Sequence, residues 1–204
     1  MLIAPADSQL DLFHQPKIIN CTSMASARNA YGDAAQEIVY TLLGITPIRI
    51  NGNYDYCFDG ARGAEYFEIK STRAGSGKVV VYDFRMDKER RADVKLTYLI
   101  VCHSLRGHRE DILQAMAARP VVIYSVPASV VHQFAARCPL NHIRMQAHYT
   151  NRTGYSRAGY IEGYRNVSLK WLAEACEWTE TAIENTIGTG NVLLRSFVAV
   201  DAAQ

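Results

Sequence analysis

Two continuous apolar runs, at residues 96–103 and 121–126, constrain the fold of this chain more than any other feature. Both are rich in Val, Ile or Leu, and runs of this kind predict strands that are covered on both faces, in the centre of a sheet. Residues 109–118 between them have the pattern of a helix, and residues 26–43 predict another, with apolar residues recurring on one face before Gly44. The order of these elements predicts an α/β fold in which a mixed central sheet is flanked by helices.

Further elements are expected on either side of this centre. Residues 46–58 and 64–72 predict a hairpin, and the apolar run 78–84 predicts a strand. Residues 86–94 are highly charged and predict either a solvated segment or a short helix. Toward the C-terminus we expect a helix at 127–137, a long helix at 168–187 capped by Ser168, and a last strand at 192–200.

Composition narrows the class of protein. The chain of 204 residues is 49% apolar and 21% charged, as in an ordinary soluble globular domain. No run approaches the roughly 20 apolar residues of a membrane span, and no signal-peptide pattern opens the chain, so a cytoplasmic location is expected. The five cysteines are scattered without Cys-x-x-Cys spacing, which favours free thiols over zinc or disulfides. There is no phosphate-binding Gly-x-x-x-x-Gly-Lys motif, so no nucleotide cofactor is expected.

The most informative motif lies in residues 55–70. If residues 64–72 form a strand, Glu68 and Lys70 lie on one face while the apolar residues between and before them face the core. The sequence 59–63 has the composition of a turn, which would fold Asp55 back beside Glu68. Asp59 also precedes Glu68; we prefer Asp55 as the first acid because Asp59-Gly60 is typical of a turn.

Two converging carboxylates and an ammonium group define a chemistry. Carboxylate oxygens suit a hard cation such as Mg²⁺, with Mn²⁺ as a substitute. The lysine suits the negative charge that develops on a phosphate under attack. The motif therefore predicts a site that cleaves phosphodiester bonds.

These residues resemble the PD-(D/E)xK nucleases, a family that includes many restriction endonucleases, some resolvases and phage exonucleases. The resemblance spans roughly residues 28–103, with Asp55 matching the first acid, Glu68 the second and Lys70 the lysine. Tyr54 stands where many members have Pro. Members often carry a further acid on the preceding helix, for which Glu37 is the candidate and Asp33 the weaker substitute.

The resemblance implies a restriction-endonuclease-like fold and a magnesium-dependent deoxyribonuclease. We expect one domain over 1–204, with a nuclease core at roughly 26–126 and a C-terminal elaboration at 127–204 for DNA recognition and dimerisation. The size of this elaboration favours a sequence-specific type II restriction enzyme, acting on double-stranded DNA as a homodimer. The alternatives are a resolvase or exonuclease of the same superfamily, a DNA-binding protein with a decayed nuclease core, and a glycosidase that uses Asp55 and Glu68 as its acid pair.

A basic segment at residues 137–170 supports a nucleic-acid partner. It carries six basic residues against one acid, Glu162, and the basic residues are interleaved with tyrosines and histidines. Such a segment can neutralise phosphates and present polar tips to a groove. The alternative is a solvated region whose tyrosines pack locally. The candidate DNA contacts are Arg144, Arg152, Tyr155, Arg157 and Arg165.

Overall fold

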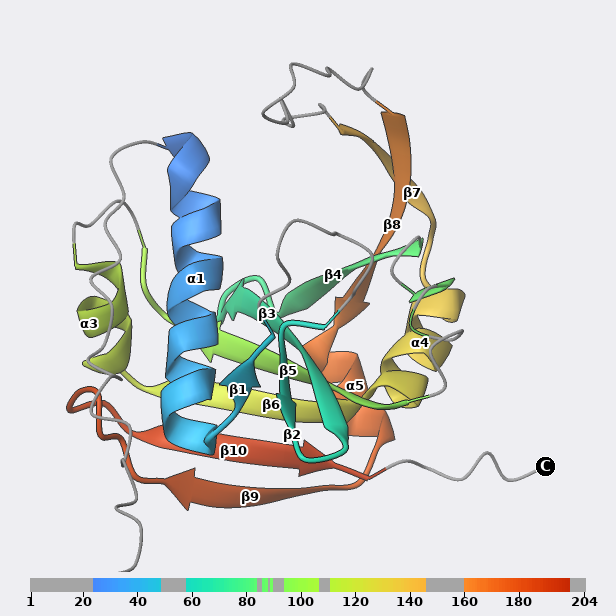
Figure 1. Ribbon diagram of the computed structural model, residues 1–204. Helices are drawn as coiled ribbons and strands as arrows, with labels where there is room; N and C mark the ends of the chain where they lie inside the picture. Colours follow the sequence, from blue (N-terminus) through green and yellow to red (C-terminus); the bar gives the residue numbers. More distant parts are fainter. Residues whose placement is uncertain are drawn as a thin grey trace, which may run out of the picture.

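The fold is an α/β arrangement of two sheets with helices packed around them, seen in a computed structural model (Figure 1). The structure describes residues 24–48, 58–83, 86–87, 89, 94–106, 111–145 and 160–198. The described helices are α1 (Met24–Leu43), α3 (Ile112–Ala117), α4 (Ala128–Arg137) and α5 (Leu169–Ala175). No helix within these ranges has both the length and the apolar character that crossing a membrane requires.

The main sheet contains seven strands within the described residues. In spatial order they are β1 (Thr46–Pro47), β2 (Gly60–Arg62), β3 (Glu65–Arg73), β5 (Lys95–His103), β6 (Val121–Pro127), β10 (Val192–Phe197) and β9 (Trp178–Ile183). The pairs β3–β5 and β6–β10 are parallel, whereas β5–β6 is antiparallel. The expected mixed sheet flanked by helices is therefore confirmed.

Both faces of the main sheet are covered, as its central apolar runs predict. On one face Phe67 and Leu99 pack in a core with α1 and α3. On the other face Tyr98 and Ile100 pack in a second core with α4, α5 and the smaller sheet. Leu99 and Ile100 are adjacent on β5 and are 2% and 0% exposed. This burial on both sides is why the strand reads as a continuous apolar run.

A smaller sheet stands beside the main one. It consists of β4 (Lys78–Tyr82), β8 (Tyr160–Ser168) and β7 (Asn141–Met145), all antiparallel. In Figure 1 the β7–β8 ribbon rises away from the main sheet, on the side where α1 begins. The segment after residue 126 thus completes both sheets, because β9 and β10 extend the main sheet while β7 and β8 join β4.

The hairpin of the sequence motif turns at a different place from the one expected. Gly60 lies within β2, and the turn between β2 and β3 contains Gly63, whose φ is +60°. A Cβ atom on Gly60 would lie 2.6 Å from Cγ2 of Ile45. Gly60 is therefore required for close packing against Ile45, and the Asp59-Gly60 pair does not form the turn.

The predicted long helix at 168–187 is also wrong. The helix α5 ends at Ala175, and residues 178–183 form β9, which pairs with β10. The β-branched residues Thr179, Thr181 and Ile183 favour a strand over a helix. The predicted cap is confirmed, because the Ser168 hydroxyl accepts a hydrogen bond of 3.3 Å from the Trp171 backbone N–H.

Candidate functional site

Glu68 and Lys70 lie together on one face of β3, as their spacing predicts. The Glu68 side chain is 0% exposed, and the Lys70 ammonium group donates a hydrogen bond to its Oε1 atom. Phe67 and Ile69 belong to the core on the opposite face, with α1. Glu68 is aligned with Tyr98 on the parallel strand β5, so the carboxylate lies in the interior and not on a solvated edge.

Asp59, which directly precedes β2, contacts the Glu68–Lys70 motif on β3. Its Oδ2 atom accepts a hydrogen bond of 2.7 Å from the backbone N–H of Ile69, the residue between Glu68 and Lys70. Its own N–H donates to the Phe67 carbonyl oxygen at 2.8 Å. Asp59 is fixed further because its carbonyl oxygen accepts a hydrogen bond of 2.8 Å from the Tyr40 hydroxyl on α1. The Asp59 carboxylate is therefore held at the centre of the Glu-x-Lys motif.

The preferred first acid, Asp55, lies outside the described residues. The reason for preferring it over Asp59 no longer holds, because Asp59-Gly60 is not the turn. The structure places Asp59 against the backbone that carries Glu68 and Lys70. Asp59 thus becomes the better supported candidate, while the role of Asp55 stays a prediction.

The carboxylates of Asp59 and Glu68 are possible ligands for Mg²⁺. Within the described ranges no three His, Cys, Asp or Glu side chains gather as a metal-binding group. Mg²⁺ sites commonly use only one or two carboxylates and complete the octahedron with water and phosphate oxygens. The two carboxylates of Asp59 and Glu68 fit that donor set, with Lys70 beside them.

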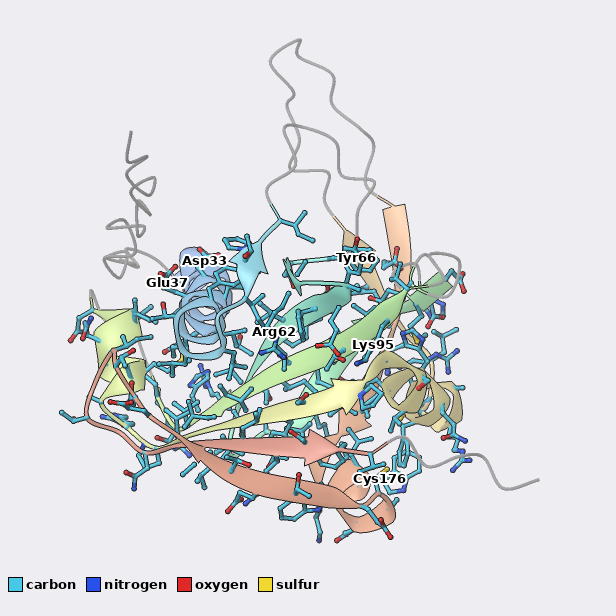
Figure 2. The ribbon with its side chains drawn as sticks, turned by 60° about the horizontal axis from the view of Figure 1, so that its bottom comes forward. Asp33, Glu37, Arg62, Tyr66, Lys95 and Cys176 are labelled. Carbon is cyan, nitrogen blue, oxygen red and sulfur yellow. The ribbon has the colours of Figure 1, made fainter. Side chains whose placement is uncertain are left out.

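The acids on α1 face a different environment. Glu37 is half-buried on α1, which packs against the Phe67 side of β3, whereas Glu68 points to the other side. In Figure 2 Asp33 and Glu37 lie together on α1, at a distance from Tyr66, Arg62 and Lys95. The participation of Glu37 in the site stays a prediction.

Arg62 and Lys95, both labelled in Figure 2, belong to a charged group at the start of β3. Both contact Glu65: Nη2 of Arg62 lies 3.5 Å from Oε2, and the Lys95 ammonium group donates to Oε1. The hydrogen bond from Lys95 lowers the pKa of the Glu65 carboxyl below its ordinary value. Lys95 is highly exposed, as in an ordinary surface ion pair.

Only part of the basic segment falls in the described residues. Arg144 lies on β7, and Arg152, Tyr155 and Arg157 lie outside the described residues. Arg165 lies on β8, where its Nε donates to Asp83 at 2.9 Å and its Nη1 donates to the Cys138 carbonyl oxygen at 2.8 Å. These bonds join β8 to the end of α4, so Arg165 has a structural role whether or not it also contacts DNA.

The sequence does not predict a second buried carboxylate, that of Glu89. Glu89 lies in the charged run 86–94, for which the sequence predicts either a solvated segment or a short helix, and its side chain is 0% exposed. Its Oε2 atom accepts a hydrogen bond from the Tyr98 hydroxyl and also contacts Nε2 of His132, each at 2.6 Å. A hollow of about 600 Å³ lies beside this group, lined by Glu89, His132 and the start of α4. Glu89, Tyr98 and His132 come from three separate segments of the chain, so no local sequence pattern predicts their contact.

The described cysteines offer no activated thiol. Cys102, Cys138 and Cys176 are free, as predicted, and burial raises the pKa of each thiol. A protonated thiol is a poor nucleophile and a poor metal ligand. Cys21 and Cys57 lie outside the described residues.

Comparisons of this chain with family models, with curated proteins and with solved structures found no match. The functional assignment therefore depends on the geometry of the side chains themselves. Among the described residues, the group of Asp59, Glu68 and Lys70 has the residue types and arrangement that best define a chemistry.

Proposed function

We propose that this protein is a magnesium-dependent endonuclease that hydrolyses phosphodiester bonds of double-stranded DNA. The observation that carries the proposal is the hydrogen bond from the Ile69 N–H to the Asp59 carboxylate, which brings a second acid to the Glu68–Lys70 pair. Two acids and a lysine, on β3 and directly before β2, match the residue types that metal-assisted phosphate hydrolysis requires.

Each side chain has a distinct part in the proposed reaction. Glu68 and Asp59 would hold the Mg²⁺ ion, with Asp55 as the alternative first acid. When bound, Mg²⁺ polarises the phosphate and lowers the pKa of the attacking water. Lys70, fixed by its contact with Glu68, orients that water or stabilises the charge on the phosphate oxygens. The attacking water releases a proton to solvent as its oxygen bonds to phosphorus, the bond from phosphorus to one sugar oxygen breaks, and that oxygen takes up a proton from a solvent water.

Within this chemistry we propose a sequence-specific, restriction-type enzyme that acts as a homodimer. The support is the amount of chain beyond residue 126, which builds the β7–β8 ribbon as well as the outer strands of the main sheet. A ribbon that rises from the body and belongs to the basic segment 137–170 offers a surface for reading DNA. The resolvase or exonuclease alternative differs in substrate and not in the residues of the site.

The decisive test is cleavage of DNA by the purified protein. Supercoiled plasmid and linear duplex are incubated with Mg²⁺, with Mn²⁺, with Ca²⁺ and with a chelator, and the ends of the products are sequenced. We expect cleavage with Mg²⁺ and Mn²⁺ that stops when the metal is chelated. Ends that share one sequence support a restriction-type enzyme, whereas progressive loss from linear ends supports an exonuclease.

Two variants link the activity to the site. Glu68→Gln removes the charge of the buried carboxylate with little change in size, and should abolish cleavage. Glu65→Gln makes the same change on the exposed part of the same strand, and should cleave as the wild type does. A protein that binds DNA but never cleaves it, under any of these metals, would instead fit the decayed nuclease.

A further inference from the structure

A hollow of about 400 Å³ opens where the parallel strands β3 and β5 end side by side, with Arg73 aligned with His103. Its described lining contains no acidic side chain. In α/β proteins, ligands commonly bind beyond the carboxyl ends of parallel strands. The residues of this Arg73 pocket that concern ligand binding are Arg73, Gly75, Ser76, His103, Ser104 and Arg106.

The two arginines of the Arg73 pocket keep their charge uncompensated by the described side chains. In the described part of the chain, the arginines that form ion pairs are Arg62, Arg165 and Arg195. Nη2 of Arg106 lies 3.8 Å from the position that a Cβ atom on Gly75 would occupy, so its guanidinium group sits against the turn after β3. Guanidinium groups bind phosphate through two parallel hydrogen bonds, which makes arginine pairs suited to oxyanions.

His103 adds a buried polar atom to the same pocket. The residue is 2% exposed, and its Nδ1 atom has no hydrogen-bond partner among the described residues. Its ring stacks on Tyr31, with centroids 5.0 Å apart, and the Arg73 guanidinium carbon lies 5.8 Å from the centre of the same Tyr31 ring. A buried polar atom without a partner is costly, so a ligand that bonds to it gains affinity.

The protonation state of His103 suits an oxyanion. Burial, together with the nearby charge of Arg73, lowers its pKa from 6.5 to about 4. The imidazole is therefore neutral at pH 7 and carries one N–H group. With the proton on Nδ1, that N–H group would be available to donate a hydrogen bond to an oxygen of a ligand.

We propose that the Arg73 pocket binds a phosphate group of a DNA strand, held by Arg73, Arg106 and His103. The assignment of the phosphate to DNA rests on the proposed function, whereas the selection of an oxyanion does not. Lys70 and Arg73 are three positions apart on β3, so their side chains point to opposite faces, and Arg73 lies on the face that carries Tyr31 of α1. The pocket would therefore hold a different phosphate from the one beside Lys70.

Two titrations test the pocket and separate the sources of the phosphate. The His103 ring signals, assigned by comparison with His103→Phe, are followed by NMR while inorganic phosphate or a short DNA duplex is added. Ca²⁺ replaces Mg²⁺ so that the duplex stays intact. We expect both ligands to shift the His103 signals. Arg106→Gln should lose both shifts, weaken duplex binding about tenfold and lower the salt slope by about 1. Lys95→Gln removes a charge at the other end of β5 and should keep both shifts.

The possible results divide the two proposals. A His103 response to phosphate but not to duplex would overturn the DNA assignment, and the site would bind a free oxyanion. No response to either ligand, with wild-type duplex affinity in Arg106→Gln, would overturn the pocket. Duplex binding that shifts His103 in a protein unable to cleave DNA under any metal would refute the nuclease and support the pocket.

Discussion

The carboxylate of Asp59 accepts a hydrogen bond of 2.7 Å from the backbone N–H of Ile69, the residue that separates Glu68 from Lys70. This contact places an acid that directly precedes β2 at the centre of the charged motif on β3. It also gives Asp59 two possible roles, because the carboxylate can fix the segment before β2 to the middle of β3 and can bind a metal ion. The two roles are separable by substitution.

The first prediction concerns that separation. Asparagine keeps an oxygen that can accept the Ile69 hydrogen bond but has no negative charge, so Asp59→Asn should fold normally and lose cleavage by about 100-fold or more. Asp59→Ala loses the hydrogen bond as well, and should also be less stable by about 1–3 kcal/mol. Cleavage rates in Mg²⁺ and urea unfolding curves measure the two effects. If Asp55→Asn loses activity and Asp59→Asn does not, Asp55 is the first acid.

The second prediction concerns the pH dependence of stability. Because the pKa of His103 in the folded protein is about 4, below its ordinary 6.5, the unfolded chain binds this proton more readily between those values. The stability that neutral His103 permits is present above pH 6.5 and is lost as the pH falls toward 4. Urea unfolding at pH 7 and pH 4.5 should show a smaller decline for His103→Phe, which keeps the ring stacked on Tyr31 and cannot titrate. The exposed His142→Gln serves as the control and should decline as the wild type does.

The third prediction concerns the buried Glu89. Tyr98→Phe removes the hydroxyl that donates to Glu89 and should destabilise the protein by about 1–3 kcal/mol. Tyr66→Phe provides a matched control. The Tyr66 ring packs on Phe58, and among the described residues its hydroxyl makes no hydrogen bond to a buried carboxylate. Thermal unfolding of both variants gives the comparison. Equal melting temperatures for the two variants would show that the Tyr98 hydroxyl contributes little.

The fourth prediction concerns the basic segment. Arg165→Ala breaks the bonds to Asp83 and to the Cys138 carbonyl oxygen, so it should lower stability by about 1–3 kcal/mol. A change in DNA affinity in that variant would then mix folding with binding. The cleaner variant is Arg152→Gln with Arg157→Gln, which leaves Arg165 in place and should reduce the salt slope of DNA binding by about 2. An unchanged salt slope would remove these two residues from the DNA interface.

The elements that the sequence predicts well are those whose burial imposes a local pattern. Strand β5 is covered on both faces, so its residues are apolar without interruption. Strand β9 lies at the edge of the sheet, and five of its six residues are exposed. Strand β9 therefore has no apolar pattern, and the sequence predicts a helix in its place. The alternation of Phe67, Glu68, Ile69 and Lys70 is local as well, which is why this half of the site could be predicted.

The remainder of the site depends on contacts between distant segments. Asp59-Gly60 has the composition of a turn when only its neighbours in sequence are considered. Position 60 nevertheless requires glycine because a larger side chain would clash with Ile45. Glu89 looks solvated among its charged neighbours, but the chain carries it to Tyr98 and His132. In both cases the decisive partner lies elsewhere in the sequence, so patterns within a short window could not reveal it.

The last prediction concerns the pairing of Lys70 with Glu68. The Lys70 ammonium group is bonded to a fully buried carboxylate. Lys70→Met should therefore lower cleavage by about 10²- to 10³-fold and also destabilise the protein, by about 3–5 kcal/mol, because the buried Glu68 carboxylate loses the Lys70 charge. The double variant Glu68→Gln/Lys70→Met has lost both charges of this pair and should regain most of that stability while remaining inactive. Melting temperatures and cleavage rates of the single and double variants form the cycle. A double variant as unstable as Lys70→Met would mean that the two charges do not stabilise each other.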